Sequence, residues 1–254
     1  MKKIFLFLSA ISFVALSSCS SNDDGPATNP AVTDILLKRA VYQQANGDGL
    51  NFTADYFYDG NKLLKEQYND GSFSKFFYSG DLITKVEYFV DGTLYTKETF
   101  AYNPAGKLTE YRHRFMSDSS DDIYTYTYNS NNTVTRTTVG LPSETSTMTY
   151  TNGEISKEVQ SNGNTYVYTY DSNNNPMKNV TGYAEIADAV VGDYELHGRA
   201  KNIISIILQN ENQNYMMNSF IYNSNGYPTK VNSAAIFDDS SPNNTEYLTV
   251  TYSY

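Results

Sequence analysis

The two histidines are the first candidates for acid–base chemistry in this sequence, because a free imidazole titrates near neutral pH. His113 lies in Tyr111-Arg112-His113-Arg114-Phe115, where charges alternate with aromatic residues, and this pattern favours the solvent face of a strand. His197 lies in Glu195-Leu196-His197-Gly198 and is the better placed of the two to line a cavity. Neither belongs to a nucleophile elbow, a zincin motif or a phosphate loop. We therefore predict no catalytic residue.

Oxygen ligands for calcium are abundant, yet the best loop lacks the decisive ones. Residues 171–175 (Asp-Ser-Asn-Asn-Asn) match the first positions of an EF-hand loop, but Pro176 stands where glycine is needed and Gly182 where a bidentate glutamate is needed. Two histidines and one cysteine are too few for a metal site built on imidazole and thiolate. We predict no metal and no cofactor. The 28 acidic residues make some carboxylate pair inevitable, so a glycan hydrolase with an Asp/Glu pair stays a remote alternative.

Cys19 is the only cysteine, and its surroundings suggest a specific modification. A short basic start precedes the apolar stretch 4–16, which is too short for a bilayer-spanning helix and fits a secretory signal. The step Leu16-Ser17-Ser18-Cys19 resembles a bacterial lipobox, in which the cysteine receives diacylglycerol. We predict a lipoprotein signal peptide over residues 1–18, lipid attachment at Cys19 and no disulfides.

Residues 19–32 are dominated by small polar residues, Gly and Pro, so we predict a flexible tether there. Asn22, Asp23 and Asp24 resemble the acidic export signal of surface-exposed lipoproteins in Bacteroidota-type bacteria. This resemblance implies an outer-membrane lipoprotein exposed at the cell surface, with the periplasmic face as the alternative. The membrane is then a partner through the lipid anchor. A net charge of −10 argues against a nucleic-acid partner.

From residue 33 onward, an aromatic-x-Tyr step followed by a turn recurs and predicts a β-meander. The anchor tyrosines of this step are Tyr58, Tyr78, Tyr102, Tyr128, Tyr150, Tyr170, Tyr222 and Tyr252. The first six are 20 to 26 residues apart. A second turn, such as Asp91-Gly92, suits a two-residue hairpin because both central residues need positive φ. Each unit is then two strands, which gives about 14–16 antiparallel strands.

The faces of these strands follow from their alternation. In Tyr124-Thr125-Tyr126-Thr127-Tyr128, a period of two places the tyrosines on one face and the threonines on the other. The second face carries Thr, Lys and Glu, which does not match the apolar outward band of a membrane-spanning barrel. A flat sheet would expose a very large aromatic patch, so we expect a strongly curved sheet or open barrel with the tyrosines inside. We assign residues 33–254 to this single all-β domain.

Residues 180–219 interrupt the repeat and predict an insertion with one short helix. Segment 184–191 has good helix formers with apolar residues on one side, and Gly192 supplies a stop. Segment 202–208 is rich in β-branched residues and predicts a buried strand. Two interpretations stay open: a helix on the sheet edge, or a plug that fills the concave aromatic face, which we favour.

The step Tyr-x-Tyr-[Asp/Asn]-x-x-Gly-x-Leu resembles the YD-type (RHS-like) β-hairpin repeat. The closest copies are Phe100–Leu108 and Phe220–Gly226, and one copy has Asn132 in place of the glycine. The likeness covers most of 52–254 and extends to lipoproteins of Bacteroidota-type bacteria that carry a domain of unknown function. The resemblance implies a lipid-anchored β-meander and no particular reaction.

Three functions remain. The preferred one is a non-enzymatic surface lipoprotein that presents loops or a groove to a protein partner. The second is a glycan- or lipid-binding module that uses the concave tyrosine-rich face, and the third is the hydrolase named above. An insertion that fills the concave face favours the first function, whereas an open face favours the second.

Overall fold

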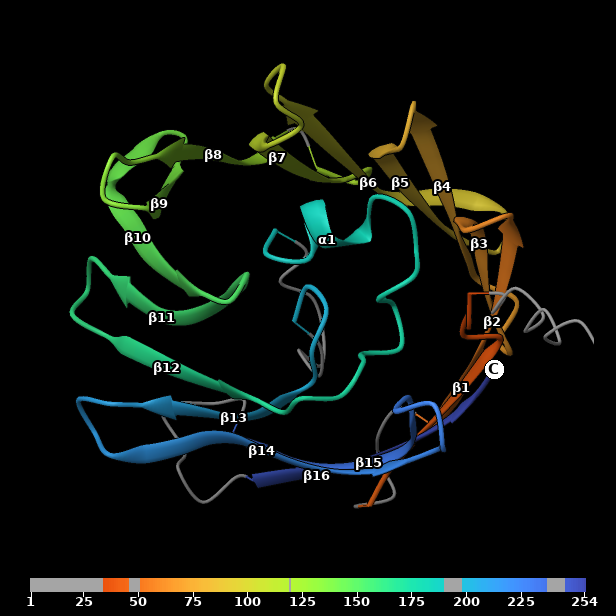
Figure 1. Ribbon diagram of the computed structural model, residues 1–254. Helices are drawn as coiled ribbons and strands as arrows, with labels where there is room; N and C mark the ends of the chain where they lie inside the picture. The colour runs from red at the N-terminus through yellow and green to blue at the C-terminus, as the bar shows by residue number, and fades with distance from the viewer. Residues whose placement is uncertain (1–33, 46–50, 119, 190–197, 237–244) are drawn as a thin grey trace, which may run out of the picture. The chain divides into compact units, whose positions relative to one another are not determined.

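The computed structural model describes residues 34–45, 51–118, 120–189, 198–236 and 245–254, all within the compact unit Asp34–Tyr254. In this part of the chain, sixteen strands form one antiparallel sheet in which every strand pairs with its neighbours in sequence. The sheet closes into a barrel because the first strand also pairs with the last, Arg39 opposite Ser253 (Figure 1). The all-β prediction is confirmed, and the sheet closes fully, which removes both exposed edges.

The strands are β1 (Arg39–Gln44), β2 (Phe52–Asp59), β3 (Lys62–Tyr68), β4 (Phe73–Ser79), β5 (Leu82–Val90), β6 (Thr93–Tyr102), β7 (Leu108–Phe115), β8 (Asp122–Tyr128), β9 (Thr133–Thr138), β10 (Leu141–Thr151), β11 (Glu154–Gln160), β12 (Thr165–Tyr170), β13 (Ile203–Leu208), β14 (Gln213–Tyr222), β15 (Pro228–Ile236) and β16 (Thr245–Ser253). One helix, α1 (Tyr183–Ile186), is described. None of the described helical structure is long and apolar enough to cross a membrane.

A β-bulge recurs at the anchor tyrosine and decides which side chains face inward. In the β2–β3 hairpin, Tyr58 pairs with Leu63 and Phe57 pairs with Lys65, so Leu64 is the extra residue. The bulge reverses the alternation, so Leu63 is fully buried inside while Lys65, two residues later, faces outward. Equivalent shifts occur beside Tyr78, Tyr102, Tyr150 and Tyr222.

Between β12 and β13, the described residues 171–189 and 198–202 form an interior segment that runs inside the barrel and carries α1 (Figure 1). Met177 and Val180 pack with Leu63 and Val250 on one side of the interior. Beyond α1, Ala189 belongs to a second cluster built on the β5–β10 side. The described parts of this segment therefore contact two different parts of the barrel wall.

The expected insertion, 180–219, differs from the observed one in its bounds. Residues 203–219 belong to β13 and β14, so the strand expected over 202–208 is a regular member of the barrel wall. The helix expected over 184–191 is represented by the four residues of α1 and a following turn to Ala189. The remainder of that helix and Gly192 lie outside the described residues. Helix α1 stays short because it begins at Gly182 with no side-chain cap.

Candidate functional site

The barrel interior contains ionisable side chains that the sequence analysis assigned to the outer face. Arg136 shows the reason most clearly. The β8–β9 hairpin has no bulge, so Arg136 keeps the phase of Val134 and pairs with the buried Tyr126 on the inner face. The same inner face carries Glu158, which pairs with the buried Met148 on one side and with Tyr166 on the other. Asn132 takes the place of the usual turn glycine with φ +62° and forms the same turn as Gly106, so the turn residues do not signal the missing bulge.

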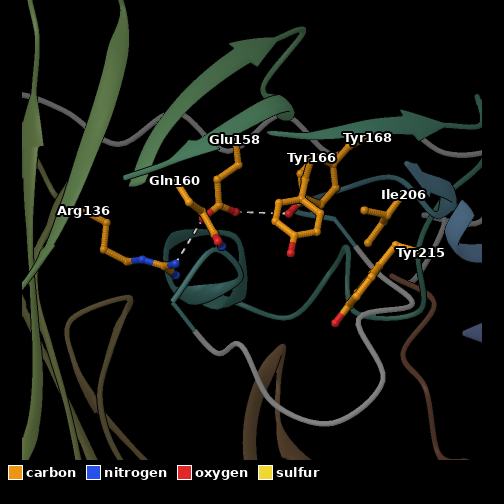
Figure 2. A pocket seen from close by; sticks show the side chains of 7 residues that line it. All are labelled: Arg136, Glu158, Gln160, Tyr166, Tyr168, Ile206 and Tyr215. Carbon is orange, nitrogen blue, oxygen red and sulfur yellow. Dashed lines mark hydrogen bonds and ion pairs between the residues drawn. The ribbon is translucent and has the colours of Figure 1, made fainter. Parts of the chain in front are cut away.

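A cavity of about 130 Å³ lies between these two residues and a group of tyrosines (Figure 2). Its walls come from five strands of the sheet, β9 and β11 to β14. The lining residues are Arg136, Glu158, Gln160, Tyr166, Tyr168, Ile206 and Tyr215. The cavity is open on one side.

The polar wall of the cavity is an ion pair held by hydroxyl groups. Arg136 Nη2 lies 3.1 Å from Glu158 Oε1 and donates to Ser146 Oγ at 3.2 Å. Tyr168 donates from its hydroxyl to the other Glu158 oxygen at 3.2 Å (Figure 2). The Arg136 and Glu158 side chains are 19% and 10% exposed. Because the pair is mostly out of water and internally neutral, the wall offers directed donors and acceptors rather than net charge.

The opposite wall is aromatic and aliphatic. The rings of Tyr166 and Tyr215 meet edge to face with centroids 5.5 Å apart. Ile206, fully buried, lies beneath them in a cluster that also includes Met216. An edge-to-face pair leaves ring faces and hydroxyl groups directed along the cavity, which suits a ligand with both apolar and polar sides.

Two further carboxylates fix the interior segment and do not line the cavity. Buried Glu154 accepts backbone N–H bonds from Arg199 at 2.7 Å, Ala200 at 2.8 Å and Lys201 at 3.0 Å. Asp188 accepts the Tyr150 hydroxyl at 2.8 Å, and burial raises the pKa of Asp188 to about 6, while Arg199 and Tyr150 act in the opposite direction. Glu154 is thus occupied by its contacts with residues 199–201, and Asp188 by its contact with Tyr150 on the wall.

A second inward-facing acid, Glu66, lies on β3 beside a ring of tyrosines. The Tyr68 hydroxyl donates to Glu66 at 2.9 Å, and burial raises the Glu66 pKa to about 7 against the effect of that bond. Glu66 shares its face with Tyr56, directly opposite on β2. It marks the polar part of the interior on the far side from the cavity.

His113 is on the inner face, which corrects the expectation of a solvent-face position. It pairs with Glu98 on β6, and burial raises the pKa of Glu98 while the nearby imidazole opposes the rise. The alternation was misjudged because the bulge at Thr109 reverses the phase of β7, so that buried Tyr111 and His113 share a face. Neither His113 nor Glu98 is among the residues that line the cavity.

The other residues singled out in the sequence divide into two groups. Cys19, Asn22, Asp23, Asp24 and His197 lie outside the described residues. In the Asn-rich turn, Asp171 accepts from the backbone N–H of Asn173 at 3.0 Å and from Asn202 Nδ2 at 3.0 Å, so internal donors occupy its oxygens. In the described ranges, no three His, Cys, Asp or Glu side chains gather into a group that could hold a metal ion.

Comparison with known proteins adds support for the fold. No family model matches the chain, and no curated protein matches it. A porin-like protein from Bacteroides uniformis is similar in structure with a TM-score of 0.50 and 15% identity, covering 85% of this chain and 97% of that one. A porin-like protein from Bacteroides vulgatus has a TM-score of 0.47 and 14% identity, covering 87% and 99%. At such identities the first likeness supports a shared barrel fold only, and the YD-type resemblance stays a prediction.

Proposed function

We propose that this barrel is a non-enzymatic binding protein that takes a terminal sugar unit of a glycan into the Arg136–Glu158 cavity. The observation that carries the proposal is one cavity with an internally neutral ion pair on one wall and tyrosine rings on the other. The cavity is open on one side, which favours the glycan-binding function over the protein-partner function.

The chemistry of the walls selects a neutral, hydroxyl-rich ligand. A charged ligand would have to compete with one member of the buried ion pair, at the cost of leaving the other unpaired. Vicinal hydroxyls, by contrast, both donate and accept, so they match the guanidinium and carboxylate edges and the Gln160 amide together. The apolar face of a sugar ring packs against a tyrosine ring in the same way as other flat apolar surfaces.

The size of the cavity limits what enters. Pockets for drug-sized ligands usually occupy about 300–1,000 Å³. A cavity of about 130 Å³, open on one side, suits one ring at a time. A longer glycan would therefore bind by its end, with the remaining units in the open part of the barrel.

The cavity does not favour the hydrolase alternative. Glycoside hydrolysis uses two carboxyl groups that flank the scissile bond. Of the described residues that line the cavity, Glu158 is the one carboxylate, and Arg136 and Tyr168 both bind it. A raised carboxyl pKa is found at Asp188, but this group serves the interior segment.

The membrane attachment and location are part of the same proposal. The lipobox-like step ending in Cys19 and the acidic residues Asn22, Asp23 and Asp24 support a lipid-anchored protein at the outer membrane, exposed at the cell surface. The barrel itself would stand outside the bilayer. Its inner face holds the buried aliphatic and aromatic residues, whereas outward positions include Lys65, Thr125 and Thr147, the reverse of a lipid-facing barrel.

A thermal-shift panel tests this function. All described contacts lie in Asp34–Tyr254, so a protein that starts at Ser20 retains them. It would be heated with neutral monosaccharides and disaccharides, with fatty acids and with calcium. A sugar at about 100 times its dissociation constant adds about 2.7 kcal/mol, or roughly 5–10 °C in Tm.

Two variants make the panel specific. Gln160→Ala should remove most of the sugar-induced shift, because the amide lines the cavity and its loss leaves the ion pair intact. Gln67→Ala, on the outer side of β3, is the matched control and should keep the full shift. A shift with fatty acids alone, or an equal sugar shift in both variants, would contradict binding of a sugar in this cavity.

A further inference from the structure

A row of charged side chains, four of them basic, crosses the outer face of the barrel on β3–β7. Each member stands directly opposite the next in the register, in the order Lys65, Lys75, Glu87, Lys97 and Arg114. The inward-facing residues Glu66, Ser74 and Glu98 alternate with them along the strands and fix the outward direction.

This arrangement is electrostatically unfavourable in the isolated protein. Lys65 faces Lys75, and Lys97 faces Arg114, although like charges opposite one another destabilise a sheet. Arg114 is compensated by Asp121, whereas no ion pair within the described ranges involves Lys65, Lys75 or Lys97. Lys75 and Lys97 each stand opposite Glu87, whose carboxylate forms its ion pair with Lys85. The row therefore carries more positive than negative charge, on a chain whose net charge is −10.

Phenylalanines accompany these lysines on the same outer face. Phe73 and Phe89 stack with centroids 4.8 Å apart, and Lys65 Nζ lies 4.6 Å from the Phe73 ring. Lys75 Nζ lies 5.1 Å from the Phe89 ring. One strand away, Phe57 is 51% exposed. Cationic and aromatic groups presented together are typical of protein surfaces that lie at the interface of a membrane.

The chain joins the barrel beside this face. Asp34, the first described residue, accepts a hydrogen bond from Asn61 in the β2–β3 turn, and Asn179 donates to the Ile35 carbonyl at 3.0 Å. Residues 20–33 span at most about 50 Å when fully extended. A lipid attached to Cys19 therefore keeps its bilayer within reach of β3–β6.

We propose that the Lys–Phe face, formed by Phe57, Lys65, Phe73, Lys75, Phe89 and Lys97, lies on the anionic headgroup surface of the membrane that holds the anchor. The lipid supplies the attachment, and this face supplies the orientation. The inference goes beyond sugar binding and depends on the proposed lipidation for its location, although the contact itself does not need the lipid.

Co-sedimentation with vesicles tests the contact without the lipid. The protein starting at Ser20 would be mixed with phosphatidylcholine vesicles, with or without about one quarter phosphatidylglycerol. We expect binding to the anionic vesicles only, and its loss at high salt. The triple variant Lys65→Gln/Lys75→Gln/Lys97→Gln should bind at least tenfold more weakly, because each lysine near an anionic surface contributes roughly a factor of five.

The control removes the same charge elsewhere on the barrel. Lys107→Gln/Lys157→Gln/Lys230→Gln changes lysines outside this face and should keep wild-type vesicle binding. Equal loss in both triple variants, or no binding of the wild type to anionic vesicles, would overturn the proposal. Binding to an acidic polysaccharide such as alginate, with none to vesicles, would assign the face to a glycan instead and would also overturn it. The sugar-induced Tm shift should persist in both triples, so failure here is distinct from failure of the cavity proposal.

Discussion

The hydroxyl of Tyr78 donates a hydrogen bond of 3.1 Å to the backbone carbonyl of Leu63, the buried aliphatic residue of the preceding hairpin. The same relation joins Tyr102 to Ile83 and Tyr128 to Leu108. The β-bulge next to Tyr78 opens the register at the point where the ring turns back toward its neighbour. The repeated tyrosine is therefore both a core residue and a bond between successive hairpins.

Removing this hydroxyl should weaken the barrel by a small, defined amount. Tyr78→Phe keeps the ring but leaves the Leu63 carbonyl without its donor, so we expect a loss of about 1 kcal/mol in the free energy of unfolding. Urea denaturation measures it. Tyr247→Phe, whose ring is 52% exposed, is the control and should change stability little. Equal effects of both substitutions would show that the inter-hairpin bond contributes nothing.

The inward-facing Glu66 should make stability depend on pH in the neutral range. Burial raises its pKa from the ordinary 4.5 to about 7, so between these pH values the folded state holds a proton that the unfolded state has lost. Stability should therefore be highest below about pH 5 for this group and fall as pH rises to about 7. Glu66→Gln keeps an acceptor for Tyr68 and should raise stability at pH 8 by about 1–2 kcal/mol.

The test for Glu66 is chemical denaturation of wild type and variant between pH 5 and 8. The variant should lose the fall in stability across this window. Glu87→Gln, on the outer face, is the matched control. An unchanged pH profile in Glu66→Gln would place the titrating group elsewhere.

Glu154 should hold the interior segment in place. Its carboxylate, on β11, accepts three backbone N–H bonds from residues 199–201. Glu154→Ala should cost about 2–4 kcal/mol, because buried donors are left unpaired. Hydrogen exchange at Ala200 and Lys201 should accelerate, while β5 amides stay protected. Exposed Glu144→Ala should alter neither quantity.

The interior segment approaches the backbone of the wall closely at Gly182, which has φ +77°. A Cβ there would lie 2.6 Å from the Asp81 carbonyl oxygen and 3.0 Å from the Ile83 nitrogen. Gly182→Ala should therefore destabilise by about 2–4 kcal/mol. Gly92→Ala separates strain from contact, because its φ of +75° is similar but nothing lies within 4 Å. It should cost only about 1 kcal/mol, and thermal unfolding compares the two.

Local patterns in the sequence predicted most of the fold. Alternating tyrosines and threonines predicted the inner and outer faces, and Asp91-Gly92 predicted a hairpin that the structure has, with positive φ at both residues. Bulges were invisible because they depend on which residues pair across strands. This is why His113 was assigned to the outer face, and why the inward position of Arg136, which follows from the missing bulge in β8–β9, was not predicted.

Closure of the barrel and the cavity depend on long-range pairing. The contact of β1 with β16 joins Arg39 to Ser253, at opposite ends of the described chain, and no local signal specifies it. The cavity likewise needs Arg136 on β9 and Tyr215 in β14 to face the same space. A single sequence does not report such a juxtaposition, whereas the hairpin repeat predicts only that neighbouring strands pair.

Ring signals of the tyrosines provide the most direct test of sugar binding in the cavity. Protein labelled at the tyrosine rings would be titrated with the same neutral sugars and followed by NMR, with Tyr166→Phe and Tyr215→Phe used to assign two signals. We predict saturable shifts at Tyr166, Tyr168 and Tyr215, and none at exposed Tyr95 and Tyr247. Shifts confined to the exposed tyrosines, or no shift with any sugar, would contradict the proposed function.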